Sequence, residues 1–144
     1  MLILAIDTAD ARGSLALLRD QAVVAMLAHD SSEDYSSWLL PAANQLAASV
    51  GIGLADVELY AACAGPGSFT GLRVGLTAVK AWSEIHSRPI AAVSRLETIA
   101  TLVAEPQPWV AAFFDAHRKQ VFGGLYRWEG NTLRLAGEEM VITP

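Results

Sequence analysis

The sequence predicts an α/β fold with the element order βββαβαβα, followed by a linker and three more strands. Three observations predict it. Apolar runs of five to seven residues, such as residues 2–6 and 57–63, are typical of buried strands. A glycine-rich turn at residues 65–67 joins one such run to a longer apolar segment with helical periodicity. The second part also repeats the opening, because an apolar strand ends in an aspartate in both, at Asp7 and at Asp115.

Composition narrows the class of protein. Apolar residues make up 53% of the 144 and charged residues 17%, which is typical of a globular domain. The formal net charge is −5, and Arg118-Lys119 is the only close basic pair, so a strongly basic nucleic-acid grip is not expected. No apolar stretch approaches the roughly 20 residues of a membrane span, and the first residues lack a basic signal-peptide start. With Cys63 as its single cysteine, the chain is expected in the reducing cytoplasm, without membrane association.

The first half contains most of the expected elements. After the strand at 2–6, a hairpin of strands 14–18 and 23–28 is joined at residues 19–21. A helix follows from about residue 36 to 50, with Pro41 in its first turn or so and glycines at its end. Strand 57–63, the glycine turn, helix 69–85, strand 90–93 and a helix from Ser94 to about residue 103 complete this part.

The second half is shorter. Glu105-Pro106-Gln107-Pro108 is interpreted as a linker, followed by strands 109–114, 121–128 and 133–142. The expected domains are a first lobe at 1–104, a linker at 105–108, and the start of a truncated second lobe at 109–144.

The glycine turn admits two interpretations. Gly65 and Gly67 can adopt backbone angles closed to other residues, and Ser68 is a favourable N-cap for the next helix. Such a turn either binds an anion at the helix start or lets the helix pack closely on its neighbours. The spacing matches neither the Walker A loop nor the dinucleotide fingerprint, which favours close packing.

The same segment carries a resemblance to a known family. It is similar to the signature of the TsaB family, also called YeaZ, within the actin, Hsp70 and sugar-kinase superfamily; the signature residues are Gly65, Pro66, Gly67, Ser68, Phe69, Thr70, Gly71, Leu72, Arg73, Val74 and Gly75. Residues 3–8, 39–41 and 115–118 also resemble the family's strings. The resemblance implies an actin-like, ribonuclease H-like lobe, with a mixed sheet flanked by helices.

The resemblance also implies a function. Family members take part in making threonylcarbamoyladenosine in ANN-decoding tRNA, as non-catalytic scaffolds that bind the catalytic subunit TsaD and work with the ATPase TsaE. It therefore implies an accessory subunit that is not itself an enzyme and that forms a homodimer when alone. It also implies that tRNA is contacted only indirectly, and that ATP or ADP binds, if at all, only in the assembled complex.

Two helices offer more apolar surface than one sheet can cover. On a helical wheel, the segments 36–50 and 69–85 both present wide apolar sectors with narrow polar stripes. These apolar sectors are covered either by other elements of the same lobe or by another protein, and we favour coverage by another protein. The residues expected at this interface are Trp38, Leu39, Ala42, Leu46, Leu72, Leu76, Val79 and Lys80.

Other chemistry is weakly indicated. Asp7, Thr8 and Gly13, with Asp115 and Arg118 as the matching turn of the second part, are candidate vestigial phosphate loops. An Asx-type turn stabilised by its own backbone is the favoured interpretation of the Asp7 turn. No pair of histidines has metal-binding spacing, so no metal is expected. The alternatives are an ATP-binding enzyme of the sugar-kinase superfamily and the M22-type peptidase of older glycoprotease-like family names, for which no Gly-x-Ser-x-Gly elbow is present.

Overall fold

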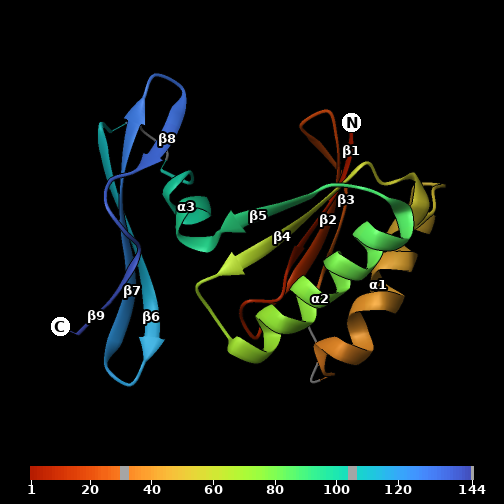
Figure 1. Ribbon diagram of the computed structural model, residues 1–144, viewed down its shortest axis with the longest axis horizontal. Helices are drawn as coiled ribbons and strands as arrows, with labels where there is room; N and C mark the ends of the chain where they lie inside the picture. The colour runs from red at the N-terminus through yellow and green to blue at the C-terminus, as the bar shows by residue number, and fades with distance from the viewer. Residues whose placement is uncertain (30–32, 104–106, 144) are drawn as a thin grey trace. The chain divides into compact units, whose positions relative to one another are not determined.

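The structure is a computed structural model that describes residues 1–29, 33–103 and 107–143 (Figure 1). Contacts divide the chain into two compact units, Met1–Val93 and Ser94–Pro144. In chain order the elements are β1 (Leu2–Asp7), β2 (Ser14–Arg19), β3 (Ala22–Ala28), α1 (Tyr35–Ser49), the 3-10 helix η1 (Leu54–Asp56), β4 (Leu59–Gly65), α2 (Phe69–His86), β5 (Ile90–Ser94), α3 (Arg95–Ala100), β6 (Trp109–His117), β7 (Gln120–Glu129), β8 (Thr132–Leu135) and β9 (Met140–Ile142). The predicted βββαβαβα order is therefore present.

The first unit is a five-stranded mixed sheet with two helices on one face. Its strand order is β3-β2-β1-β4-β5, with β1 antiparallel to β2 and parallel to β4. Along β1, Leu2, Leu4 and Ile6 are buried under α1 and α2, while the residues between them are half-buried. The two helices lie beside each other, α1 over β2 and β3, and α2 over β4 and β1 (Figure 1).

The second unit is a smaller antiparallel sheet covered on one face by α3. Leu96 and Ala100 of α3 are buried with Val110, Ala112 and Tyr126 of the sheet. The helix ends at Ala100 and not near residue 103. Because α3 packs on β6 and β7, the contacts group it with the second unit rather than with the first lobe in which it was expected. The predicted domain limits remain a prediction, and residues 105 and 106 of the linker lie outside the described residues.

Two predicted strands differ from the structure in their bounds. The predicted strand 133–142 is two strands, because Gly137 has a φ of +100° and the chain turns there. Both pieces pair with β7, β8 at one end and β9 at the other. The predicted strand 57–63 begins two residues later, at Leu59, because Val57 donates its N–H to the Leu54 carbonyl and closes the η1 turn. Val57 is fully buried in the core, which explains why an apolar residue occupies this turn.

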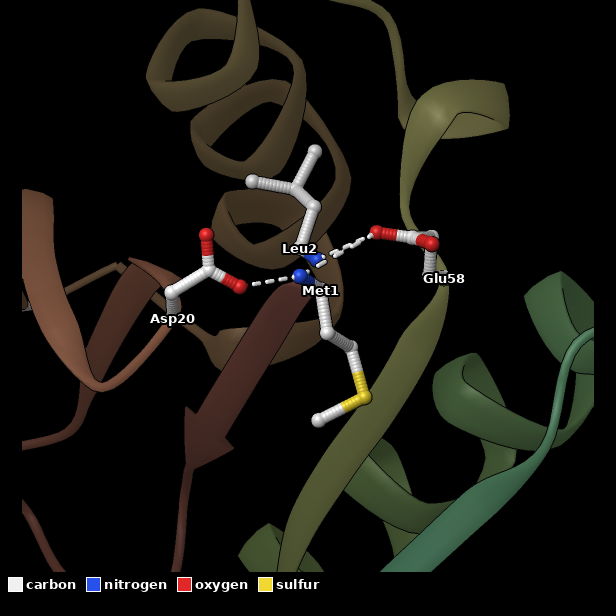
Figure 2. A network of polar contacts seen from close by, with 4 residues as sticks. All are labelled: Met1, Leu2, Asp20 and Glu58. Atoms are coloured by element: carbon white, nitrogen blue, oxygen red, sulfur yellow. Dashed lines mark hydrogen bonds and ion pairs between the residues drawn. The ribbon is translucent and has the colours of Figure 1, made fainter.

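Polar contacts fix the beginning of β1 (Figure 2). The Met1 amino group donates to the Asp20 carboxylate, and the Leu2 N–H donates to Glu58 Oε2 at 2.6 Å. The Asp20 hydrogen bond raises the pKa of the Met1 amino group, and the same bond lowers the pKa of Asp20. The contacts tie the first strand to the β2–β3 turn and to the segment that leads into β4.

Candidate functional site

The signature turn forms the connection from β4 to α2. Gly65 has a φ of +103°, a conformation that favours glycine, and the Gly65–Pro66 peptide bond is cis. Ser68 is the N-cap, since its Oγ accepts a hydrogen bond from the Gly71 N–H at 3.2 Å. The helix begins at Phe69, as the sequence predicts.

The turn and the first turns of α2 press against the residues that follow β1. Ser68 donates its N–H to the Ala9 carbonyl at 2.7 Å. Thr8 is only 2% exposed, and its hydroxyl donates to the Gly71 carbonyl at 2.7 Å. Both contacts join segments some sixty residues apart in the sequence.

Three signature glycines make this approach possible. A Cβ added at Gly67 would lie inside 3.0 Å of Ala9 O, and one at Gly71 would lie inside 3.0 Å of Thr8 O. At Gly75 the atom met inside 3.0 Å is the Thr8 hydroxyl oxygen. Any other residue at these positions would push α2 away from β1, so the geometry agrees with the close-packing interpretation of the motif.

Each candidate phosphate turn contains the same local hydrogen bond. Asp7 Oδ1 accepts from the Ala9 N–H at 2.8 Å, and Asp115 Oδ1 accepts from the His117 N–H at 2.8 Å. These are Asx turns, in which the carboxylate satisfies a backbone donor two residues on. Arg118 follows at the tip of the β6–β7 hairpin and is exposed. A phosphate-binding role for these turns stays a prediction.

An aromatic cluster at the start of α1 fixes the loop after β1, and the sequence analysis did not find it. The buried His29 ring lies 4.6 Å from the Tyr35 ring and 4.8 Å from the Trp38 ring, centroid to centroid. Tyr35 donates its hydroxyl to the Asp10 carbonyl at 2.5 Å, and a Cβ at Gly13 would collide with that hydroxyl. Gly13 therefore has a packing role. In the sequence, the aromatic residues at the start of the helix, next to a polar loop, could have indicated this cluster.

The predicted interface residues divide into two groups. Four have their side chains in the core of the first unit and offer no surface there, namely Leu39, Ala42, Leu46 and Val79. For these four the prediction needs correction, because the apolar sectors they belong to face the sheet. Four others are accessible: Trp38, Leu72 and Leu76 are half-buried, and Lys80 is exposed.

The helices also expose apolar residues that the prediction left out. Leu40 is 52% exposed on α1, and Phe69 is 69% exposed at the beginning of α2. The Arg73 guanidinium lies 3.9 Å from the centre of the Phe69 ring. Aromatic and arginine side chains of this kind are enriched where protein partners bind.

Tyr60 and His86 contact each other inside the first unit. The Tyr60 hydroxyl donates to the Leu54 carbonyl at 2.7 Å and lies 2.6 Å from His86 Nδ1. Burial raises the pKa of Tyr60. Within the described residues, no three His, Cys, Asp or Glu side chains gather as metal ligands. In the same part of the chain, no helix is both long enough and apolar enough to cross a bilayer.

Comparisons with known proteins agree with one another. The model of the family described as "TsaD: tRNA N6-adenosine threonylcarbamoyltransferase" matches residues 26–144. The chain is 35% identical to the Bacillus subtilis tRNA threonylcarbamoyladenosine biosynthesis protein TsaB, over 92% of the chain and 58% of that protein. It is 32% identical to the Escherichia coli protein of the same name, over 100% of the chain and 63% of that protein. The chain thus spans about three fifths of the length of these relatives.

A solved structure matches the whole fold. YeaZ from Pseudomonas aeruginosa superposes with a TM-score of 0.85 at 32% identity, over 99% of this chain and 68% of that one. The α/β architecture predicted from the sequence, a mixed sheet flanked by helices in the actin-like arrangement, is confirmed.

Proposed function

The chain belongs to the TsaB/YeaZ family, and from this we propose that it is a non-catalytic subunit of the machinery that makes threonylcarbamoyladenosine in ANN-decoding tRNA. Its relatives in Bacillus subtilis and Escherichia coli are tRNA threonylcarbamoyladenosine biosynthesis proteins, which supports the pathway. In this role it binds a TsaD-like catalytic subunit, beside a TsaE-like ATPase, and pairs with a second copy when alone.

One observation carries the non-catalytic part of the proposal. The space beside Gly67, Gly71 and Gly75 is occupied by the chain's own Thr8 and Ala9, through their backbone oxygens and the Thr8 hydroxyl. The role of these glycines here is to hold α2 against β1, which sets the position of the outer surface of that helix. A scaffold needs its binding helix to be held rigidly in place, and this motif does that for α2.

The family model adds a reason to name the partner. It carries the description of the transferase itself and matches residues 26–144, which include α1 and α2. Two proteins of one fold can pair through equivalent surfaces, as two copies do around a twofold axis. We therefore assign accessible residues of these two helices, Trp38, Leu40, Leu72, Leu76 and Lys80, to contacts with the TsaD-like partner and with a second copy.

The proposal is tested in cells that lack their own TsaB-like protein. Expression of this chain is expected to restore threonylcarbamoyladenosine in tRNA, measured by mass spectrometry of tRNA nucleosides. Absence of the modified nucleoside despite soluble expression would count against the pathway. Calorimetry with ATP and Mg²⁺ checks the enzyme alternative, since tight binding by the isolated chain would favour it.

The interface is tested separately by charge reversal. Lys80→Glu keeps the fold intact, because Lys80 is exposed, and is expected to weaken co-purification with the catalytic subunit at least several-fold. Leu76→Glu is expected to have a larger effect and to abolish the homodimer in light scattering. Arg88→Glu, beyond the end of α2, is the matched control. If all three variants co-purify like the parent chain, the interface lies elsewhere.

A further inference from the structure

The hairpin that joins β6 to β7 has an unusual tip. Its two turn residues, Arg118 and Lys119, have φ angles of +53° and +61°, and His117 before them has a φ of +62°. Residues 117 and 120 are paired, so the two form a two-residue loop of the type that requires positive φ at both positions. Asn-Gly, Asp-Gly and Gly-Gly adopt such turns with least strain. Two long basic residues are an unfavourable choice for the fold.

A second two-residue hairpin turn, between β2 and β3 of the first unit, also has positive φ at both positions but carries no basic residue. The β2–β3 turn places Asp20 at +50° and Gln21 at +76°, and its Asp is one of the residues that tolerate this conformation. A strained conformation occupied by side chains that do not favour it is the kind of outlier that marks a functional position. The difference between the two hairpins is the positive charge at the second.

The charge at this tip is available to a ligand. Arg118 and Lys119 are exposed and are the only adjacent cations in a chain of net charge −5. In the described residues, no acid forms an ion pair with either of them. The nearby acid, Asp115, is engaged with His117, by a hydrogen bond to its N–H at 2.8 Å and by a 3.8 Å approach to its Nδ1.

We propose that the basic tip at residues 117–119 contacts the phosphodiester backbone of RNA, an inference that rests on the function proposed above. Arg and Lys side chains supply most backbone contacts in nucleic-acid complexes, and these contacts position the protein without reading sequence. This proposal differs from the expectation, implied by the family resemblance, that tRNA is contacted only indirectly. Because the rest of the chain is acidic and repels a polyanion, the contact is confined to a local point.

The form of the tip favours a backbone over a free nucleotide. A nucleotide is held in a concave pocket that buries most of its surface. The tip is a projecting turn, and the hollow of about 410 Å³ on the same sheet does not include any tip residue. That hollow is lined mainly by apolar residues such as Ala111, Phe113 and Leu125.

The sharpest test replaces both cations with the residues the turn prefers. Arg118→Asn with Lys119→Gly removes two charges and relieves the backbone, so the variant is expected to fold at least as stably as the parent chain. The probe is an unmodified transcript of an ANN-decoding tRNA, titrated over a series of salt concentrations. The slope of log affinity against log salt is expected to fall by about 1.5 to 2 in magnitude, and low-salt affinity by about tenfold.

Two controls separate the tip from other effects. Arg19→Asn with Arg88→Asn removes the same charge from exposed positions of the first unit, and Gln21→Gly relieves the other hairpin without changing charge. Neither is expected to change the slope. Equal loss in both double variants would overturn the proposal in favour of bulk charge, and so would absence of tRNA binding by the parent chain at low salt.

The remaining outcomes distinguish this inference from the proposed function. Unchanged tRNA binding by the Asn-Gly variant overturns the tip contact, even where the variant restores threonylcarbamoyladenosine in cells. Unchanged tRNA binding with loss of a co-purifying protein would assign the tip to an acidic protein partner instead. Tighter calorimetric binding of ATP than of tRNA, lost in the variant, would assign it to nucleotide phosphates. Failure of complementation with tRNA binding intact bears on the proposed function alone.

Discussion

Gly75→Ala tests whether the signature glycines exist for packing. In the middle of a helix this change normally stabilises a protein by about 1 kcal/mol. Here the new Cβ would lie inside 3.0 Å of the Thr8 hydroxyl oxygen. Overpacking of this kind costs about 2 kcal/mol, and the displaced hydroxyl loses its 2.7 Å bond to Gly71 O, worth about 1 kcal/mol. The net expectation is a loss of about 2 kcal/mol of unfolding free energy.

Removing the Thr8 hydroxyl should reverse the sign of the Gly75→Ala effect. In a Thr8→Ala background the collision disappears, because the next Thr8 atom near the added Cβ is at 3.6 Å. Gly75→Ala should then stabilise by about 1 kcal/mol, which gives a coupling of about 3 kcal/mol between the two positions. Gly71→Ala meets the Thr8 backbone oxygen instead, so its cost should persist in both backgrounds.

The assay is urea unfolding followed by far-UV circular dichroism, with hydrogen exchange of the α2 amides as a local readout. Gly53→Ala is the control, because an added Cβ there has its nearest atom at 3.7 Å. A Gly75→Ala protein as stable as the parent chain, or a cycle with no coupling, would refute the packing explanation of the motif.

Two further predictions concern single polar groups. Ser68→Ala removes the N-cap of α2 and should cost about 1 kcal/mol in urea unfolding, whereas Ser36→Ala in α1 should change little, and equal values would contradict the cap. Burial, with the hydrogen bond to Glu139, raises the pKa of Tyr126 to about 12 from 10.0. The folded state therefore holds this proton when the unfolded chain has lost it, so stability is fully present below pH 10 and falls between pH 10 and about 12. Tyr126→Phe should show a shallower fall over that window in urea midpoints measured against pH, and an unchanged slope would contradict the assignment.

Local signals in the sequence were sufficient for several elements. The Gly65 turn and the Ser68 cap placed the beginning of α2 at the observed residue, because caps and turns depend on residues close in the chain. The apolar run that ends at Asp7 likewise identified β1. Its Asx turn was one of two interpretations that the residue types allowed.

Caps, turns and apolar runs do not predict long-range contacts. Val57 is as apolar as a strand residue, yet it closes a 3-10 turn, since only the register of β4 against β1 shows where pairing begins. Helical periodicity found wide apolar sectors but could not show that Leu39 and Val79 face the sheet while Leu76 stays half-exposed. Burial is a property of the neighbours that tertiary structure brings to a residue.

By itself, the sequence determined the α/β class, the strand-turn-helix motif and the family, because these depend on residue types at short spacing. Only the tertiary structure decided what the motif does, since the atoms that occupy the space left open at Gly71 and Gly75 come from Thr8, more than sixty residues earlier. It likewise decided which residues of the two helices remain for a partner. A chain encodes such contacts only through its fold, in which distant segments compete for the same volume.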